Sequence, residues 1–161
     1  MLKRRIKVYL DTSVISHLEQ PTKSTEFDGS HLFWNNAEKL DIVLSDTVFS
    51  EISNCSKDKE RKLLSYINEI RYENLEIISE IKELTKDIIS RGIIPPSSKD
   101  DATHIATALY AECDYLLSWN MKHLACVRAN DGVRILTLEN HMKELKILTP
   151  LMILSIFDEV I

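Results

Sequence analysis

The chain has 161 residues, of which 44% are hydrophobic and 28% charged, with only 3 glycines and 4 prolines. This composition predicts a single compact, helix-rich domain over 1–161 and excludes extensive disorder. A net charge of −5 does not indicate a general nucleic-acid binder, although acids that bind cations would leave the remaining surface less negative. No apolar run is long enough to cross a membrane, so we expect a cytoplasmic protein with no membrane partner.

Taken in order, the chain alternates between β-prone runs and segments with helical spacing. In the first half we expect a strand over 6–10, a helix over 14–19, a loop over 20–29, a helix over 31–40, a strand over 41–45, a helix over 46–52, a polar break over 56–61 and a helix over 62–70. In the second half we expect a strand over 75–78, a helix over 81–89 ended by Gly92, a helix from 100 to 109, a strand within 113–120 with Asn120 just past its end, a helix over 121–124 and a strand over 133–136. The apolar tail over 145–161 predicts a terminal helix docked on the core or on a partner.

This alternation predicts an α/β fold in three layers, with a mainly parallel sheet of four to five strands covered on both faces. The three cysteines, Cys55, Cys113 and Cys126, lack the paired spacing of a zinc or redox motif. We therefore expect them to be reduced.

Several oxygen-bearing side chains follow the predicted strands at their carboxyl ends, where ligands bind in open α/β sheets. Asp11 ends the first strand, Glu51 lies early in the helix after the second, Asp101 opens a later helix, and Asn120 follows the fourth strand. Capping of helix N-termini is the simpler explanation for each acid alone. Three remote acids in equivalent places favour one shared site.

Gathered carboxylates repel one another unless a divalent cation neutralises them. Ligation by oxygen alone suits Mg²⁺ or Mn²⁺, which can activate water and stabilise the leaving oxygen of a phosphodiester. Thr12 or Ser13 could orient water or a carboxylate. His104 is expected to be a structural side chain near the acids, and His123 a surface residue that could touch phosphate.

The segments Val8–Ser13, Val48–Ile52, Asp101–Ala108 and Asp114–Asn120 together resemble a PIN domain, over roughly residues 6–138. The resemblance implies a small α/β/α domain with a metal-dependent ribonuclease site, and many bacterial members resemble VapC-type toxins of toxin–antitoxin pairs. Carried over residue by residue, Asp11, Glu51 and Asp101 match the three main metal-binding acids. The fourth acid is replaced by Asn120, which lowers the charge available to a second cation, and Asp114 is a weaker substitute.

We therefore expect a metal-dependent endoribonuclease with Asp11, Glu51 and Asp101 as catalytic residues. Its expected partners are an RNA substrate, an antitoxin protein if it is a toxin, and a second copy in a homodimer. A PIN-like module that binds RNA or protein but cleaves poorly is the alternative, favoured by Asn120 and the acidic balance. A phosphotransfer protein shares an acid after the first strand, but Ser13 stands where a dehalogenase-like hydrolase needs a second Asp.

Overall fold

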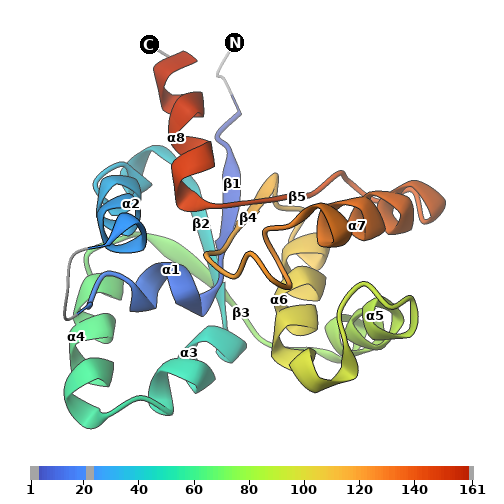
Figure 1. Cartoon of the computed structure of the whole chain (residues 1–161), viewed down its shortest axis with the longest axis horizontal. Coiled ribbons are helices and arrows are strands. Elements are labelled where there is room, and N and C mark those ends of the chain that lie inside the picture. Colours follow the sequence, from blue (N-terminus) through green and yellow to red (C-terminus); the bar gives the residue numbers. More distant parts are fainter. Residues whose placement is uncertain (1–3, 21–23, 160–161) are drawn as a thin grey trace.

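The computed structural model describes residues 4–20 and 24–159, which form one five-stranded parallel sheet with α-helices on both faces (Figure 1). The strand order is β3-β2-β1-β4-β5. The strands are β1 (Lys7–Leu10), β2 (Asp41–Ser45), β3 (Tyr72–Leu75), β4 (Tyr115–Leu117) and β5 (Lys146–Leu148). The helices are α1 (Thr12–Ser16), α2 (Thr25–Trp34), α3 (Asp46–Ser53), α4 (Lys57–Ile67), α5 (Ser79–Ser90), α6 (Lys99–Tyr110), α7 (Val127–Glu139) and α8 (Pro150–Glu159), with 3-10 turns η1 (Ala37–Lys39) and η2 (Pro96–Ser98).

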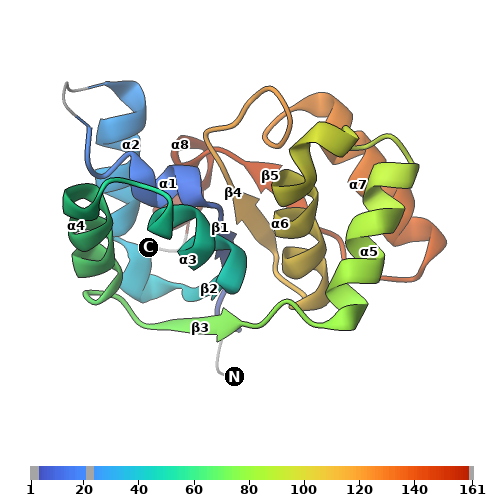
Figure 2. The ribbon, with the colours of Figure 1, turned by 90° about the horizontal axis from the view of Figure 1, so that it is seen from below.

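Figure 2 shows the three layers: α1–α4 and α8 lie on one side of the sheet, and α5–α7 lie on the other. The expected three-layer α/β/α architecture is therefore confirmed. The centre of the sheet is buried on both faces, because Val8, Tyr9 and Leu10 of the central strand are all inaccessible to solvent. None of the described helices has the length and apolarity needed to span a bilayer.

Helix α2 begins earlier than we expected, inside the region predicted as a loop over 20–29. The Ser24 side chain accepts a hydrogen bond from the Phe27 backbone N–H and so caps the helix. The helix ends at Trp34, so the prediction over 31–40 was displaced, and residues 21–23 lie outside the described part of the chain. Gly29 has a packing role, because a Cβ there would lie 2.7 Å from the Trp119 ring.

The predicted polar break over 56–61 is instead the first part of α4. Ser56 caps this helix through the Lys59 N–H, and Asp58 pairs with Arg61 and Lys62 one turn later. We predicted a break here because the segment has no apolar residues. Ion pairs between residues three and four positions apart stabilise it as a helix instead.

The prediction of a strand over 133–136 was wrong, because this segment lies inside α7. Its buried residues, Ala129, Val133 and Leu136, recur at helical spacing, whereas a short apolar run alone cannot distinguish strand from helix. The last strand is β5, in the tail, followed by α8, which packs against α2. Residues 121–124 form a turn in place of the predicted helix, and β3 lies three residues before the predicted strand.

Parallel pairing aligns the strand ends and gives the sheet two contrasting edges. We call the carboxyl edge the end where Asp11, Ser45 and Ser118 stand at or just after the strand termini, and the amino edge the end that carries Lys7, Asp41 and Asp114. The register sets Leu10 beside Leu117 and Lys7 beside Asp41. The predicted site residues can therefore be assigned to one edge or the other.

Candidate functional site

Asp11 is the central acid of the carboxyl edge, and its side chain is only 4% exposed. It directly follows β1, and its backbone N–H donates to the Leu117 carbonyl. One carboxylate oxygen, Oδ1, accepts from the backbone and side chain of Ser13, while Oδ2 accepts from the Ser118 hydroxyl at 2.6 Å. Asp11 therefore caps α1 and is also held firmly at the sheet edge, so a capping role does not exclude a site role.

Glu51 reaches this edge from α3 and is held by two other elements. Its Oε1 accepts from Thr12 Oγ1 at 3.0 Å and from His104 Nε2 at 2.6 Å. The Glu51 side chain is 33% exposed, whereas that of His104 is 2% exposed. The predicted proximity of His104 to the acids is therefore observed, as is a contact between Thr12 and a carboxylate.

Asp101 opens α6 and contacts the loop that follows β4. Its Oδ2 lies 3.2 Å from both Asn120 Nδ2 and His123 Nδ1. Asn120 Oδ1 in turn accepts the His123 backbone N–H. Ser98 occupies the N-cap position without a capping bond, so neither Asp101 nor the more exposed Asp100 caps this helix.

The predicted site residues do not all share this edge. Asp114 precedes β4 at the amino edge, where it contacts Arg4 at 2.5 Å and Lys143 at 2.9 Å. Its other oxygen accepts the Lys7 backbone N–H. The structure therefore does not bring Asp114 to Asp11, Glu51 and Asp101, because the fourth strand carries it to the opposite end of the sheet.

The electrostatics of the carboxyl edge are set by burial and by His104. Burial raises the pKa of Asp11, although the charge of His104 and the bonds from Ser118 and Ser13 partly offset it. Partial burial would also raise the pKa of Glu51, but the hydrogen bonds from His104 and Thr12 lower it overall. Burial alone would lower the pKa of His104, yet its bond to Glu51 and the nearby acids raise it.

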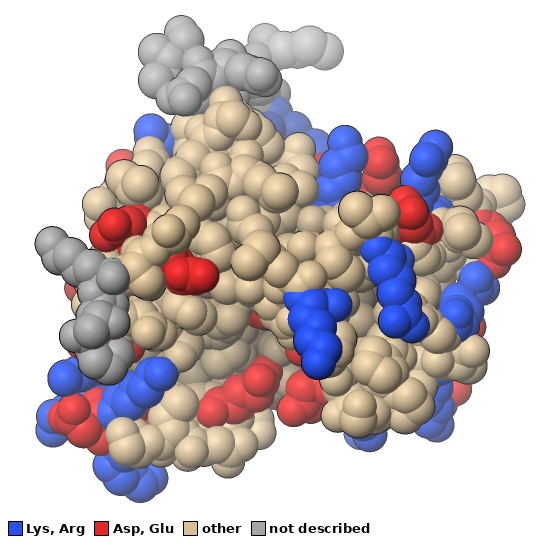
Figure 3. Space-filling model, viewed as in Figure 1, with Lys and Arg blue, Asp and Glu red and all other residues tan. Residues whose placement is uncertain are grey.

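None of the three acids forms an ion pair with Lys or Arg among the described residues. Figure 3 shows a hollow in the lower middle of this face, between the positions of α3 and α6, with acidic side chains on its sides. Lys and Arg side chains lie to its right (Figure 3). Acidic side chains thus line the hollow, and the Lys and Arg side chains lie outside it. The hollow is therefore suited to a positively charged ligand.

The donor set fits a hard divalent cation by chemistry, because it offers carboxylates and the Asn120 amide. No three His, Cys, Asp or Glu side chains in the described part of the chain are close enough to hold an ion together. Glu51 Oε2 and Asp101 Oδ1 accept no hydrogen bond from the described residues, whereas both Asp11 oxygens do. Glu51 and Asp101 therefore each keep one unused carboxylate oxygen, and side-chain rotation would be needed to bring the acids together around an ion.

Sequence reasoning missed three members of the hydrogen-bond network, Tyr9, Ser45 and Ser118. Tyr9 resembled a core residue, and it is fully buried, yet its hydroxyl contacts Ser45 and His104. Ser118 holds Asp11 and also accepts the Asn120 backbone N–H. A polar residue next to each strand terminus was the available signal for Ser45 and Ser118, whereas nothing local distinguished Tyr9.

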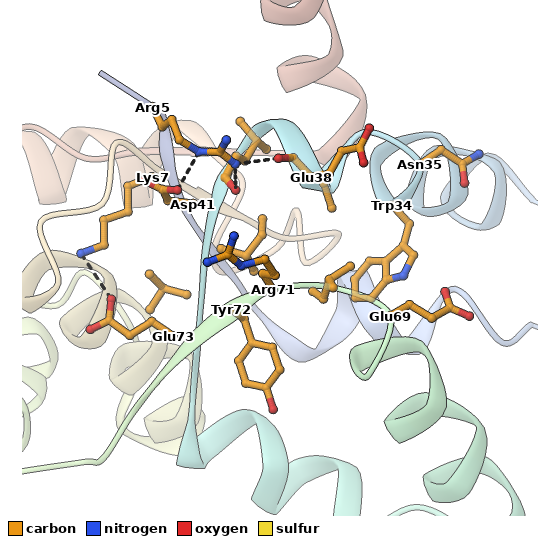
Figure 4. A pocket seen from close by; sticks show the side chains of 15 residues that line it. Arg5, Lys7, Trp34, Asn35, Glu38, Asp41, Glu69, Arg71, Tyr72 and Glu73 are labelled. Atoms are coloured by element: carbon orange, nitrogen blue, oxygen red, sulfur yellow. Dashed lines mark hydrogen bonds and ion pairs between the residues drawn. The ribbon is translucent and has the colours of Figure 1, made fainter. Parts of the chain in front are cut away.

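A groove of about 910 Å³ lies at the amino edge. Figure 4 shows its lining, in which Arg5 pairs with Asp41 and Lys7 with Glu73. The Trp34 indole N–H beside it is buried without a hydrogen-bond partner among the described residues. None of the three acids of the carboxyl edge lines this groove, so its size does not identify the candidate site.

Comparisons with known proteins identify the fold and no sequence family. No family model matches the chain, and no curated protein matches it in sequence. One similar structure is a chain of VapBC2 from Rickettsia felis, which was crystallised bound to a DNA fragment from its promoter. It is 15% identical to this chain with a TM-score of 0.53, and the match covers 89% of this chain and 98% of that one. VapC20 from Mycobacterium tuberculosis, a Sarcin-Ricin loop cleaving toxin, is 13% identical with a TM-score of 0.53, over 68% of this chain and 86% of that one. The chain therefore has the VapC-like PIN-domain fold that its motifs led us to expect.

Proposed function

We propose that this protein is a metal-dependent endoribonuclease that hydrolyses RNA phosphodiester bonds at the carboxyl edge. The observation that carries the proposal is that Asp11, Glu51 and Asp101, from three elements, all lie near His104 at the carboxyl edge without a Lys or Arg partner among the described residues. Uncompensated carboxylates at a sheet edge favour a cation as the missing charge. The VapC-like fold gives independent support.

In this proposal Asp11, Glu51 and Asp101 hold Mg²⁺ or Mn²⁺, and the Asn120 amide contributes an oxygen. The bound ion would supply an activated water and charge stabilisation for the phosphodiester. Ser13 and Ser118 keep the Asp11 carboxylate in place, and Thr12 and His104 do the same for Glu51. His123, 25% exposed beside Asp101, is positioned to contact a phosphate oxygen of bound RNA.

Cleavage of a mixed RNA pool with Mg²⁺ or Mn²⁺, and with EDTA as control, tests the proposal. We expect wild type to cut only with metal and Asp101→Asn to lose cutting. Asp100→Asn is the matched control, because Asp100 precedes Asp101 on the same helix but is more exposed and forms no side-chain bond among the described residues. Equal loss in both variants, or cutting in EDTA, would contradict the proposed site.

A binding module that cleaves poorly is the second candidate, and two observations favour it. The described acids are not assembled into a metal centre, and the neutral Asn120 occupies the place beside Asp101. Wild type that retains RNA without cutting it under either metal would establish this candidate in place of the nuclease.

We also propose a toxin role with an antitoxin partner, by analogy with the VapBC2 complex.

We propose a homodimer through the packed helices α2 and α8, because Leu32, Leu151 and Met152 on these helices are at least 40% exposed. Light scattering tests the dimer, with Met152→Asp expected to give a monomer. A wild-type monomer at working concentration would remove this proposal.

A further inference from the structure

His104 has surroundings that its helix face alone does not require. It lies on α6 among Ala102, Ile105 and Ala106, all fully buried, and is itself 2% exposed. A buried imidazole is costly unless both ring nitrogens have partners. Both do, because Nδ1 lies 2.6 Å from the Tyr9 hydroxyl and Nε2 lies 2.6 Å from Glu51 Oε1.

The hydrogen bonds form a continuous chain from the sheet interior to the site. The Ser45 hydroxyl lies 2.7 Å from the Tyr9 hydroxyl, and both residues are fully buried at the ends of β2 and β1. Because a carboxylate only accepts, Nε2 of His104 carries the hydrogen in its bond to Glu51. Tyr9 either donates to Nδ1 of a neutral ring or accepts from a charged one, so the chain holds in both states.

These linked hydrogen bonds restrain the Glu51 side chain, which would otherwise move freely. Glu51 is one-third exposed on α3, and a glutamate in that setting samples several rotamers at little cost. His104 and Thr12 both bind Oε1, and Oε2 is left without a partner among the described residues. The rigid anchor thus fixes the carboxylate by one oxygen and leaves the other for a ligand.

Helix α6 consequently contributes to the site twice. Asp101 and His104 are three residues apart and so project from neighbouring positions on one side of the helix. Asp101 is itself a proposed ligand, while His104 reaches across to Glu51 on α3. The same helix therefore sets the positions of two acids that come from different elements.

We propose that His104, anchored by Tyr9, is a positioning residue that orients Glu51 for binding a divalent cation; this inference rests on the proposed function. His104 itself touches neither metal nor RNA in this account. Residues that orient metal ligands typically change metal affinity about 10- to 100-fold when replaced.

Mn²⁺ affinity, measured by calorimetry without RNA, tests this inference through matched amide variants. His104→Gln keeps an N–H donor near the Nε2 position, whereas His104→Asn places its amide near Nδ1 and cannot reach Glu51. We expect wild type and His104→Gln to bind within about 3-fold of each other, and His104→Asn to bind about 10-fold more weakly. Thermal unfolding in EDTA checks that both amide variants are folded.

A double variant separates positioning from a general structural effect. In a Glu51→Gln background the carboxylate is gone, so adding His104→Asn should weaken Mn²⁺ binding no further. Tyr9→Phe, which removes the anchor but keeps the imidazole N–H toward Glu51, should weaken binding in the same direction as His104→Asn but by a smaller factor. Undiminished Mn²⁺ binding by both Tyr9→Phe and His104→Asn overturns the inference while leaving the nuclease proposal intact. Wild type that binds no Mn²⁺ overturns both.

Discussion

The two edges of one sheet carry acids in opposite electrostatic settings. At the amino edge, Asp114 is paired with Arg4 and Lys143, and Asp41 with Arg5. At the carboxyl edge, Asp11 is held by serine hydroxyls and a backbone N–H, and Glu51 by Thr12 and His104. The amino-edge acids are paired with Lys or Arg, whereas the basic neighbours of the carboxyl-edge acids among the described residues are the histidines His104 and His123.

Charge pairing distinguishes the two edges, whereas cavity size does not point to the candidate site. The large groove belongs to the amino edge, yet Asp41 and Glu73 in its lining each have a basic partner. A structure that leaves acids uncompensated gives up stability, which proteins accept mainly at functional sites. This contrast supports the site that we propose at the carboxyl edge.

The largest expected effect is on cleavage. Glu51→Gln keeps the shape of the side chain but removes its charge, so RNA cleavage should fall on the order of 100-fold or more. Asp114→Asn, the equivalent change at the amino edge, should leave the cleavage rate of folded protein within about 3-fold of wild type. Initial rates on one RNA at saturating Mn²⁺ compare them, and a similar loss in both would erase the distinction between the edges.

Stability should show the reverse pattern. Asp114→Asn should lower the free energy of unfolding by about 1–2 kcal/mol, because Lys143 and the Lys7 N–H lose a charged acceptor. Basic partners and the Lys7 N–H lower the pKa of Asp114 despite partial burial, so its contribution is present above pH 3.8 and is lost as pH falls through the folded-state pKa. Urea unfolding at pH 7 and pH 3 measures both effects, and an unchanged midpoint at pH 7 would refute the structural role.

Asp11 should respond to pH with the opposite sign. Burial raises the pKa of Asp11 above 3.8 in the folded state. Between pH 3.8 and that raised pKa the folded state binds more protons than the unfolded state, so the free energy of unfolding falls as pH rises through this range. Asp11→Asn should remove this loss, since an amide can accept from Ser13 and donate to Ser118. Unfolding in EDTA from pH 4 to 8 should give a shallower decline for the variant, and parallel curves would argue against a buried charge.

The smallest expected effect concerns Arg5 at the amino edge. Its ion pair with Asp41 is about half exposed on both sides, so solvent screens it strongly. Arg5→Ala should lower the free energy of unfolding by less than about 1 kcal/mol and leave cleavage unchanged. A larger loss in the same unfolding assay would mean that the bonds from Arg5 to the backbone of residues 38 and 40 matter more than the ion pair.

Much of the fold could be predicted because its signals are local. The second strand was predicted at residues 41–45, where β2 lies, and the alternation of elements gave the parallel three-layer sheet. Predictions failed where a cap outweighed composition, as at Ser24 and Ser56, or where a short apolar run was ambiguous, as at Val133.

The positions of the candidate acids could be read from the sequence better than the side chains that hold them. Asp11 directly follows a strand and Asp101 opens a helix, whereas the contact of Tyr9 with His104 depends on how α6 packs across the sheet. Asp114, which precedes the fourth strand, was expected only as a weaker substitute, and the strand register places it at the opposite end of the sheet from Asp11.

Direct titration of Mn²⁺ into wild type, Asp11→Asn and Asp114→Asn tests the contrast between the edges most directly. We predict that wild type and Asp114→Asn bind the ion with similar affinity and that Asp11→Asn loses at least about 10-fold. Equal binding by all three proteins, or a loss confined to Asp114→Asn, would contradict a cation site at the carboxyl edge.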